Sequence, residues 1–321
     1  MTVRWTLAGV AALAAALLAG LALGPTAIPL ADVLRGGLTP LDEAVLWELR
    51  APRVALGALV GGTLAVAGGA YQAVFRNPLA DPYLLGAAAG AGLGATAAIV
   101  YAGSVPLPIA AFAGATAAVA GAYALGRSVG GRDTATLILA GVAMAAFLTA
   151  LQTLLLQSDT DNVRAVYTWL LGRLSAAGWS DVLLVLPYSA ASIAVVLAHR
   201  RVLDVLRVGD EEALALGVPV GRVRLLVVGA ATLGTASAVA VSGLIGFVGI
   251  VVPHAVRLLA GSSYRAVLPL SVLFGAAFLV LADVAARTAL APAELPIGVV
   301  TACIGAPFFV VVLRSTRAAA T

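Results

Sequence analysis

Ten apolar runs, most of them about twenty residues long, dominate this sequence and limit what it can fold into. A run of that length, wound as an α-helix, crosses a bilayer and satisfies its own backbone hydrogen bonds there. Only 11 % of the residues are charged, far below soluble globular composition. We therefore expect an all-α polytopic membrane protein. The expected spanning helices are residues 3–24, 51–72, 83–102, 106–126, 134–157, 180–198, 222–243, 245–261, 267–288 and 296–314.

The first run resembles a signal peptide, because Arg4 precedes it and Pro25 follows it. At about twenty residues it is long for a signal core, so we expect a retained helix. All 19 basic residues are arginine. With the amino terminus inside, 13 of these 19 fall in inner segments, as the positive-inside rule requires. Because ten is even, both termini are expected in the cytoplasm.

Five expected helices lie in residues 1–157 and five in 180–314. Because five is odd, the two halves would have opposite topology, the arrangement of an inverted repeat around a central pathway. Between spans, the outer segments 25–50 and 158–180 are not expected to cross. The first contains an expected surface helix at 28–34, and the aromatic residues at 166–172 of the second suit the headgroup level.

Glycine pairs four residues apart indicate close helix packing. They are Gly57 with Gly61, Gly86 with Gly90, and Gly90 with Gly94. A dinucleotide site is the rival interpretation of the last three. It fails because no strand precedes these glycines and no acid follows at the distance of a ribose.

The longest polar interruption runs from Arg200 to Arg224. It mixes five arginines with four acids, and glycine and proline stand at defined breaks. Two short amphipathic helices joined by glycine and lying on the inner membrane face fit this pattern. Such a structured loop is expected to meet a soluble partner; a merely solvated connection is the alternative.

The sequence excludes several kinds of chemistry. A P-loop needs a lysine that reaches the phosphates, and this chain has none. If ATP drives it, the ATPase is a separate subunit. The single Cys303 excludes an internal disulfide and a cysteine metal cluster. With two histidines and no catalytic constellation, we expect no enzyme and no metal site.

Ionisable residues inside the expected spans are few and therefore informative. Asp283 and Arg287 stand four apart and can pair on one helix face. A proton relay through Asp283 is the alternative to structural pairing. His254 follows Pro253 and suits broken-helix carbonyls, with a haem or metal ligand as the alternative.

Several longer motifs together resemble the permease subunit of type II ABC importers for iron complexes and vitamin B12, the FecCD/BtuC-like family. The motifs are residues 49–53 (LRAPR), 72–82 (QAVFRNPLADP), 242–257 (SGLIGFVGIVVPHAVR), 281–287 (LADVAAR), 293–302 (AELPIGVVTA) and 305–308 (GAPF). They occur in the family's order and cover nearly the whole chain. The resemblance implies the BtuC-like permease fold over a single domain, 1–321.

The resemblance also implies partners and location. Permeases of this kind form homodimers with a pathway at the interface, in the bacterial plasma (inner) membrane. A dimer of a separate ABC ATPase docks on the cytoplasmic loops and holds the ATP and Mg, so this chain itself binds no cofactor. A periplasmic or lipoprotein binding protein delivers the substrate from outside. No nucleic acid is involved.

Site residues carry over by position as expectations. ATPase coupling falls to Gly209, Asp210, Glu211, Glu212, Ala213, Leu216, Gly217 and Val218. Docking of the binding protein falls to Arg50, Arg53 and Arg287, for which local pairing with neighbouring acids is the alternative. The gate would include Asn77, Leu79 and, less securely because Asp133 departs from the pattern, Thr134. The pathway would present Thr149, Gln152 and Thr153.

The expected cargo is a large chelate: a ferric siderophore first, then haem, then cobalamin, ranked by how common each is in the family. An ion-coupled secondary transporter is the main alternative. It would need buried coupling carboxylates and no docking loop, and the sequence shows the reverse. A passive channel would need a repeated filter or charge ring, and none is visible.

Overall fold

The computed structural model describes residues 2–24, 33, 37–101, 105–128, 134–159 and 161–318. Its regular elements there are helices, apart from one isolated bridge between Leu290 and Ala293. The expected surface helix at 28–34 lies outside the described residues except for Val33.

Each expected span corresponds to a helix. These helices are α1 (Thr2–Ala22), α4 (Ala51–Val74), α5 (Ala87–Val100), α6 (Leu107–Ser128), α7 (Thr134–Ser158), α9 (Trp179–Ala198), α12 (Val220–Ser242), α13 (Val248–Ala260), α14 (Tyr264–Thr288) and α15 (Ile297–Ala318). Within the described residues, seven are long and apolar enough to cross a membrane, while α5, α13 and α15 are shorter apolar helices. The all-α polytopic fold is confirmed.

The segment before α4 was expected only not to cross the membrane, and its described part contains helical structure that the sequence analysis did not place. A short helix, α3 (Pro40–Ala44), continues through a π-helical turn, η1 (Val45–Arg50), directly into α4. Thr39 begins this helix: its hydroxyl accepts a hydrogen bond from the Asp42 backbone N–H at 3.2 Å, and Pro40 suits the first helical position. The outer end of α4 therefore carries a helical extension.

The second outer segment contains a short helix, α8 (Val163–Leu170). Its Trp169 is buried in the protein core, whereas Tyr167 is exposed. Of the aromatic pair expected at headgroup level, Tyr167 alone is free to lie there. The polar interruption forms α10 (Arg200–Leu206) and α11 (Asp210–Ala215), with Gly209 between them. The expectation of two short helices joined by glycine is confirmed.

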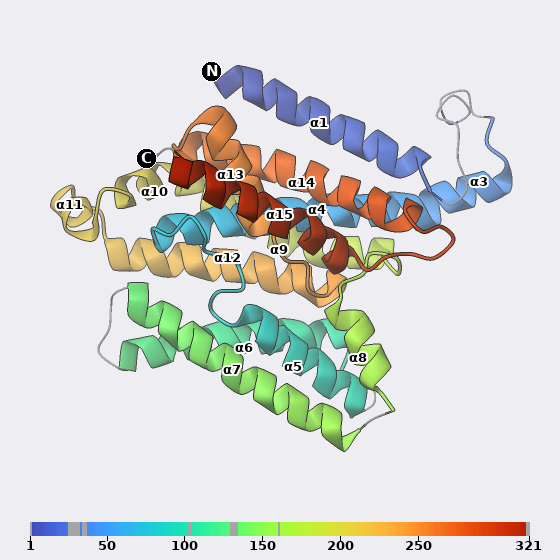
Figure 1. Ribbon diagram of the computed structural model, residues 1–321, viewed down its shortest axis with the longest axis horizontal. Coiled ribbons are helices and arrows are strands. Elements are labelled where there is room, and N and C mark those ends of the chain that lie inside the picture. Colours follow the sequence, from blue (N-terminus) through green and yellow to red (C-terminus); the bar gives the residue numbers. More distant parts are fainter. Residues whose placement is uncertain are drawn as a thin grey trace.

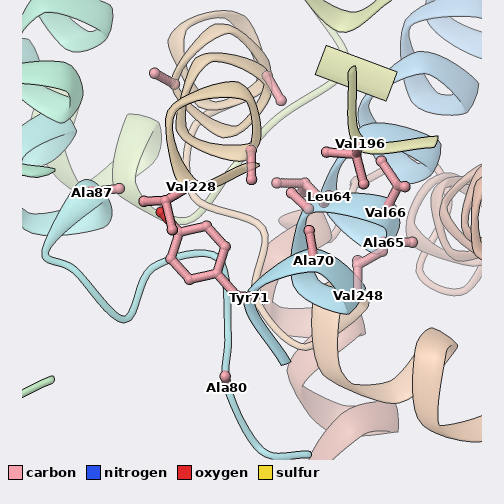
Figure 2. Packing of buried hydrophobic residues seen from close by; sticks show 14 of the residues in the cluster. Leu64, Ala65, Val66, Ala70, Tyr71, Ala80, Ala87, Val196, Val228 and Val248 are labelled. Carbon is pink, nitrogen blue, oxygen red and sulfur yellow. The ribbon is translucent and has the colours of Figure 1, made fainter. Parts of the chain in front are cut away.

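Helix α4 is the centre of the molecule and is buried over nearly its whole length. It packs against α14, α12, α9 and α13. Figure 2 shows Leu64 and Tyr71 of α4 with Val196 of α9, Val228 of α12 and Val248 of α13 around them. A helix surrounded by other helices has no polar face, which is why most of its residues are alanine, glycine, valine and leucine.

Small residues let these helices approach closely. A Cβ on Gly61 would meet the backbone of Gly275 in α14, and one on Gly90 would meet the backbone of Gly114 in α6. The expected packing role is wrong for Gly86, which precedes α5 with φ of 85° and is not inside a helix. Gly57 makes only ordinary contacts.

Contacts between helices repeat in the two halves. The pair α5 and α6 corresponds to α13 and α14, and α4 packed on α14 corresponds to α12 packed on α6. In Figure 1 the long helices run roughly alongside one another, with α10 and α11 at one end and α3 at the other. Helix α1 begins, and α15 ends, at the end that carries α10 and α11.

Candidate functional site

Helix α11 lies at one end of the molecule (Figure 1) and exposes apolar side chains there. Leu214 is 58 % exposed and Leu216 71 % exposed, while Ala213 is fully buried beneath them. Asp210, Glu211 and Glu212 occupy its first turn, where acids favour the positive end of the helix dipole. Two large apolar side chains, Leu214 and Leu216, are thus exposed close together at the end of α11, where a partner could cover them.

The end of α11 depends on Gly217. Its φ is 79°, a left-handed value that glycine adopts without cost. The Gly217 N–H donates to the Leu214 carbonyl at 2.9 Å, and the Val218 N–H donates to the Ala213 carbonyl at 3.0 Å. This pair of bonds is the Schellman arrangement that closes a helix. It fixes the direction in which the chain turns toward α12.

Ion pairs hold α11 to the membrane helices. Arg224 of α12 donates to both carboxylate oxygens of Asp210, at 2.9 and 3.2 Å. Arg76, just after α4, lies 3.6 Å from the same carboxylate. These contacts link α11 to both α12 and the turn just after α4.

Helix α10 is tied to the turn between α13 and α14. Asp204 accepts hydrogen bonds from the Ser263 hydroxyl at 2.6 Å and from the Tyr264 N–H at 2.7 Å. Arg207 donates to the Ser262 carbonyl at 2.8 Å. Together with the Asp210 pairs, these contacts connect the loop to helices of both halves.

The inner turn after α4 contains the gate candidates Asn77 and Leu79. The Asn77 side-chain oxygen accepts from the Leu79 N–H at 2.9 Å, which shapes the turn around Pro78. Leu79 is 46 % exposed, so it is free to contact another surface. The third candidate, Thr134, begins α7, but its side chain lies outside the described residues.

Gln72 and Tyr83 join this turn to the second half of the chain. The Gln72 amide donates to the carbonyls of Ala80 at 3.2 Å and Gly249 at 3.0 Å, and its oxygen accepts from Arg257. The Tyr83 hydroxyl donates to the Ile245 carbonyl at 3.0 Å. The inner turn and the residues before α13 are thus a single hydrogen-bonded unit, which the sequence did not indicate.

Two of the three docking candidates, Arg50 and Arg287, lie inside the protein. Arg50 and Arg287 are 4 % and 3 % exposed. Arg50 donates to the carbonyls of Leu21 and Ala22, at 2.9 and 3.0 Å, and Arg287 donates to that of Gly20 at 2.6 Å. They satisfy the carbonyls that the last turn of α1 leaves open. This arrangement differs from the local acid pairing that was the alternative for Arg50, and a docking role remains a prediction.

Arg53 makes the strongest ionic contacts of the outer end. It lies 2.8 Å from Asp283 and 2.9 Å from Glu294, whose side chains are 3 % and 35 % exposed. Arg287 lies 3.6 Å from Asp283, so the expected pair is confirmed, but Arg53 is the closer partner. The sequence could not indicate this contact, because Arg53 and Asp283 are 230 residues apart.

A cavity of about 720 Å³ lies where α8 ends and α15 begins. Its lining residues include Leu170, Phe247, Val299, Cys303 and Pro307. The sequence analysis did not identify the α15 residues that line this cavity. The glycine-rich residues 243–249 (GLIGFVG), part of which also lines it, are the sequence signal that could have indicated the cavity.

Of the expected pathway residues on α7, Thr149 and Thr153 are exposed. Gln152 is buried, and its amide donates to Thr96 of α5 at 3.1 Å.

His254 packs edge-on against Phe308, with ring centroids 5.9 Å apart. Within the described residues, the acidic, histidine and cysteine side chains form no group of three that could hold a metal ion.

The sequence model of the FecCD transport family matches residues 12–315. The cobalamin import permease BtuC of Halobacterium salinarum is 43 % identical over 289 residues, 89 % of this chain and 78 % of that protein. The Fe(3+)-citrate import permease YfmD of Bacillus subtilis is 40 % identical over 278 residues, 86 % and 83 % of the two chains.

A solved structure of an inward-facing ABC transporter, described as of the metal-chelate type, superposes with a TM-score of 0.87. Its sequence is 30 % identical, and the match covers 98 % of both chains. The match over residues 12–315 and the long alignments with import permeases agree with the helical architecture. This chain belongs to the FecCD transport family.

Proposed function

We propose that this chain is the membrane permease of an ATP-driven importer for a large metal chelate. The observation that carries the proposal is α11, a short helix with Leu214 and the adjacent Leu216 exposed, which Asp210 holds to both α12 and the turn just after α4. An ion-coupled transporter has no use for such a helix. A separate ATPase subunit that binds α11 could move α12 and the end of α4 together.

The proposal gives each surface a partner. Two copies of the chain form the pathway between them, and an ATPase dimer docks on the two α11 helices. Both termini lie on the cytoplasmic side with α11, which agrees with their positions at that end of the molecule (Figure 1). A binding protein docks on the opposite end, where Arg53 is the most exposed of the three docking candidates, at 11 % of its side chain.

The substrate class follows from the relatives, which import cobalamin and ferric citrate. Both are complexes of a metal ion with an organic ligand. The apolar cavity beside α15 has few polar groups, so it suits a chelate that is released by the binding protein and passes without tight binding. The ranking of siderophore above cobalamin has no support in the structure, and we propose the broader class.

The first test is ATP hydrolysis by purified protein. The permease alone should show no hydrolysis above an empty-detergent control, because it has no P-loop lysine. Reconstitution with the ATPase subunit should produce turnover that the binding protein and its loaded chelate increase. Hydrolysis by the permease alone, at the rate of the complex, would disprove the division of labour.

A further inference from the structure

A groove between α6 and α12 takes no part in the coupling, gate and docking contacts described above. Its volume is about 720 Å³. Its apolar walls include Val119, Ala120, Ala124, Leu225, Val228 and Leu233. Small residues on both helices, among them Ala120, Ala124 and Gly229, leave this space open. A Cβ on Gly229 would meet nothing within 4 Å.

The groove has the length of one leaflet. Its lining extends along α6 from Thr116 to Ser128, which is about 18 Å at the rise of an α-helix. Half of the hydrocarbon core of a bilayer is about 15 Å. The groove therefore runs from the middle of the membrane to one surface, which is the cytoplasmic surface in the proposed orientation.

Arginines gather at the surface end of this groove. A second cavity, of about 530 Å³, continues from it and shares Tyr123, Arg127 and Leu225 with it. Arg222 and Arg224 also line the second cavity. Arg224 is bonded to Asp210, whereas Arg127 and Arg222 are exposed and form no ion pair within the described part of the chain. Among the described residues that line the two cavities, none is acidic.

We propose that this is a binding site for an anionic phospholipid of the inner leaflet. One acyl chain lies in the groove between α6 and α12, and the phosphate lies between Arg127 and Arg222. Guanidinium groups bind phosphate through paired hydrogen bonds, and basic pockets between membrane helices on the cytoplasmic side select anionic headgroups. The apolar groove favours a lipid over a soluble phosphate, because a soluble phosphate would contact only the arginines and leave the groove empty.

A second copy of the chain suits this surface less well. In a membrane dimer the two-fold axis lies along the membrane normal, so the same end of each copy meets its equivalent. Packing α6 and α12 against their counterparts would therefore bring Arg127 and Arg222 toward the same arginines of the other copy. A lipid phosphate would neutralise these positive charges, whereas a second copy would place like charges beside them and repel them.

Native mass spectrometry of the delipidated, full-length permease tests the headgroup contacts. Wild type titrated with phosphatidylglycerol should bind it in preference to phosphatidylcholine. The double variant Arg127→Gln/Arg222→Gln should bind phosphatidylglycerol about fivefold more weakly for each arginine removed. Arg201→Gln, which removes an exposed arginine of α10 that lines neither cavity, is the matched control and should bind like wild type.

Gly229→Leu tests the groove independently of the arginines. Because a Cβ there meets nothing, the leucine side chain should fill the groove without displacing the protein. We expect an unchanged melting temperature and loss of phosphatidylglycerol binding. Glycerophosphoglycerol, which is phosphatidylglycerol without its two acyl chains, should not bind measurably.

Three results would overturn the proposal. One is equal phosphatidylglycerol binding by the Arg127→Gln/Arg222→Gln, Arg201→Gln and wild-type proteins. Another is binding of glycerophosphoglycerol as tight as that of the lipid, which would show a soluble-anion site. The third is conversion of a dimer to a monomer by Gly229→Leu, which would show that a second copy of the chain occupies the groove.

Discussion

Gly217→Pro should abolish coupling between the ATPase and the permease while leaving the membrane helices folded. Proline fixes φ near −65°, whereas Gly217 has φ of 79°. It also removes the N–H that donates to Leu214 at 2.9 Å. The lost hydrogen bond and the changed φ together break the arrangement that closes this helix of six residues, and so short a helix has little stability of its own. Without α11, the exposed leucines no longer form one surface.

The measurement is binding of the purified ATPase subunit to Gly217→Pro permease, together with ATP-dependent uptake in reconstituted vesicles. Both should fall to background, with the yield and melting temperature of the permease unchanged. Gly217→Asn is the matched control, because asparagine tolerates the left-handed conformation and keeps its N–H. A Cβ at this position meets nothing within 4 Å, so the control introduces no clash. Normal uptake by Gly217→Pro would show that α11 is not the coupling element.

Arg53→Ala should destabilise the outer end of the permease by about 3–5 kcal/mol, the cost of removing one member of a buried ion pair. Asp283 is 2 % exposed, and Arg53 is its closest cationic partner, at 2.8 Å. Arg287 stays 3.6 Å away, because it also holds the end of α1 through Gly20. Asp283 would then lack most of its hydrogen bonds inside the protein.

Thermal unfolding in detergent measures this effect, with two comparisons. Glu294→Gln removes the other partner of Arg53, which is 35 % exposed, and should cost no more than about 1 kcal/mol. Arg53→Met with Asp283→Leu removes both charges and should recover most of the lost stability, since apolar replacement of a buried pair is often neutral. An Arg53→Ala protein as stable as Glu294→Gln would show that Asp283 does not depend on Arg53.

The Arg53→Ala and Glu294→Gln variants together separate a structural role of Arg53 from a docking role. A docking role for Arg53 requires it to exchange Glu294 for an acid of the binding protein while it keeps Asp283. Glu294→Gln would then leave stability nearly unchanged and alter binding-protein affinity. Arg50 and Arg287 have no such freedom in this structure, since both are buried against the end of α1.

Hydrophobicity predicted the helices well because the membrane constrains them so strongly. Each expected span overlaps one helix, and the two short helices around Gly209 were expected from their glycine and charge pattern. The starts of α5 and α13 were placed too early. Residues such as Leu84, Leu85 and Ile245 are apolar but lie in irregular turns, whose backbone is held by side chains such as Tyr83 and Gln72.

Contacts between distant residues were beyond sequence reasoning. The sequence placed Arg50 in a segment between spans. It did not indicate that the Arg50 side chain donates hydrogen bonds to the carbonyls of Ala22 and Leu21 in α1, 28 and 29 residues earlier in the chain. The polarity of Gln152 suggested a pathway lining, yet its amide is used within the protein by Thr96. Whether a polar group faces a pathway or a neighbouring helix depends on helix rotation, and an alanine- and glycine-rich sequence gives little indication of rotation.

Uptake into vesicles that contain the permease, its ATPase and the binding protein tests the proposed function most directly. The substrates are cyanocobalamin, haem and a ferric chelate, each offered with the binding protein outside and ATP inside. The proposal predicts uptake of a chelate that requires ATP and all three proteins, and that persists when the proton and sodium gradients are dissipated. Uptake driven by such a gradient without ATP or the ATPase would contradict it and would show an ion-coupled transporter.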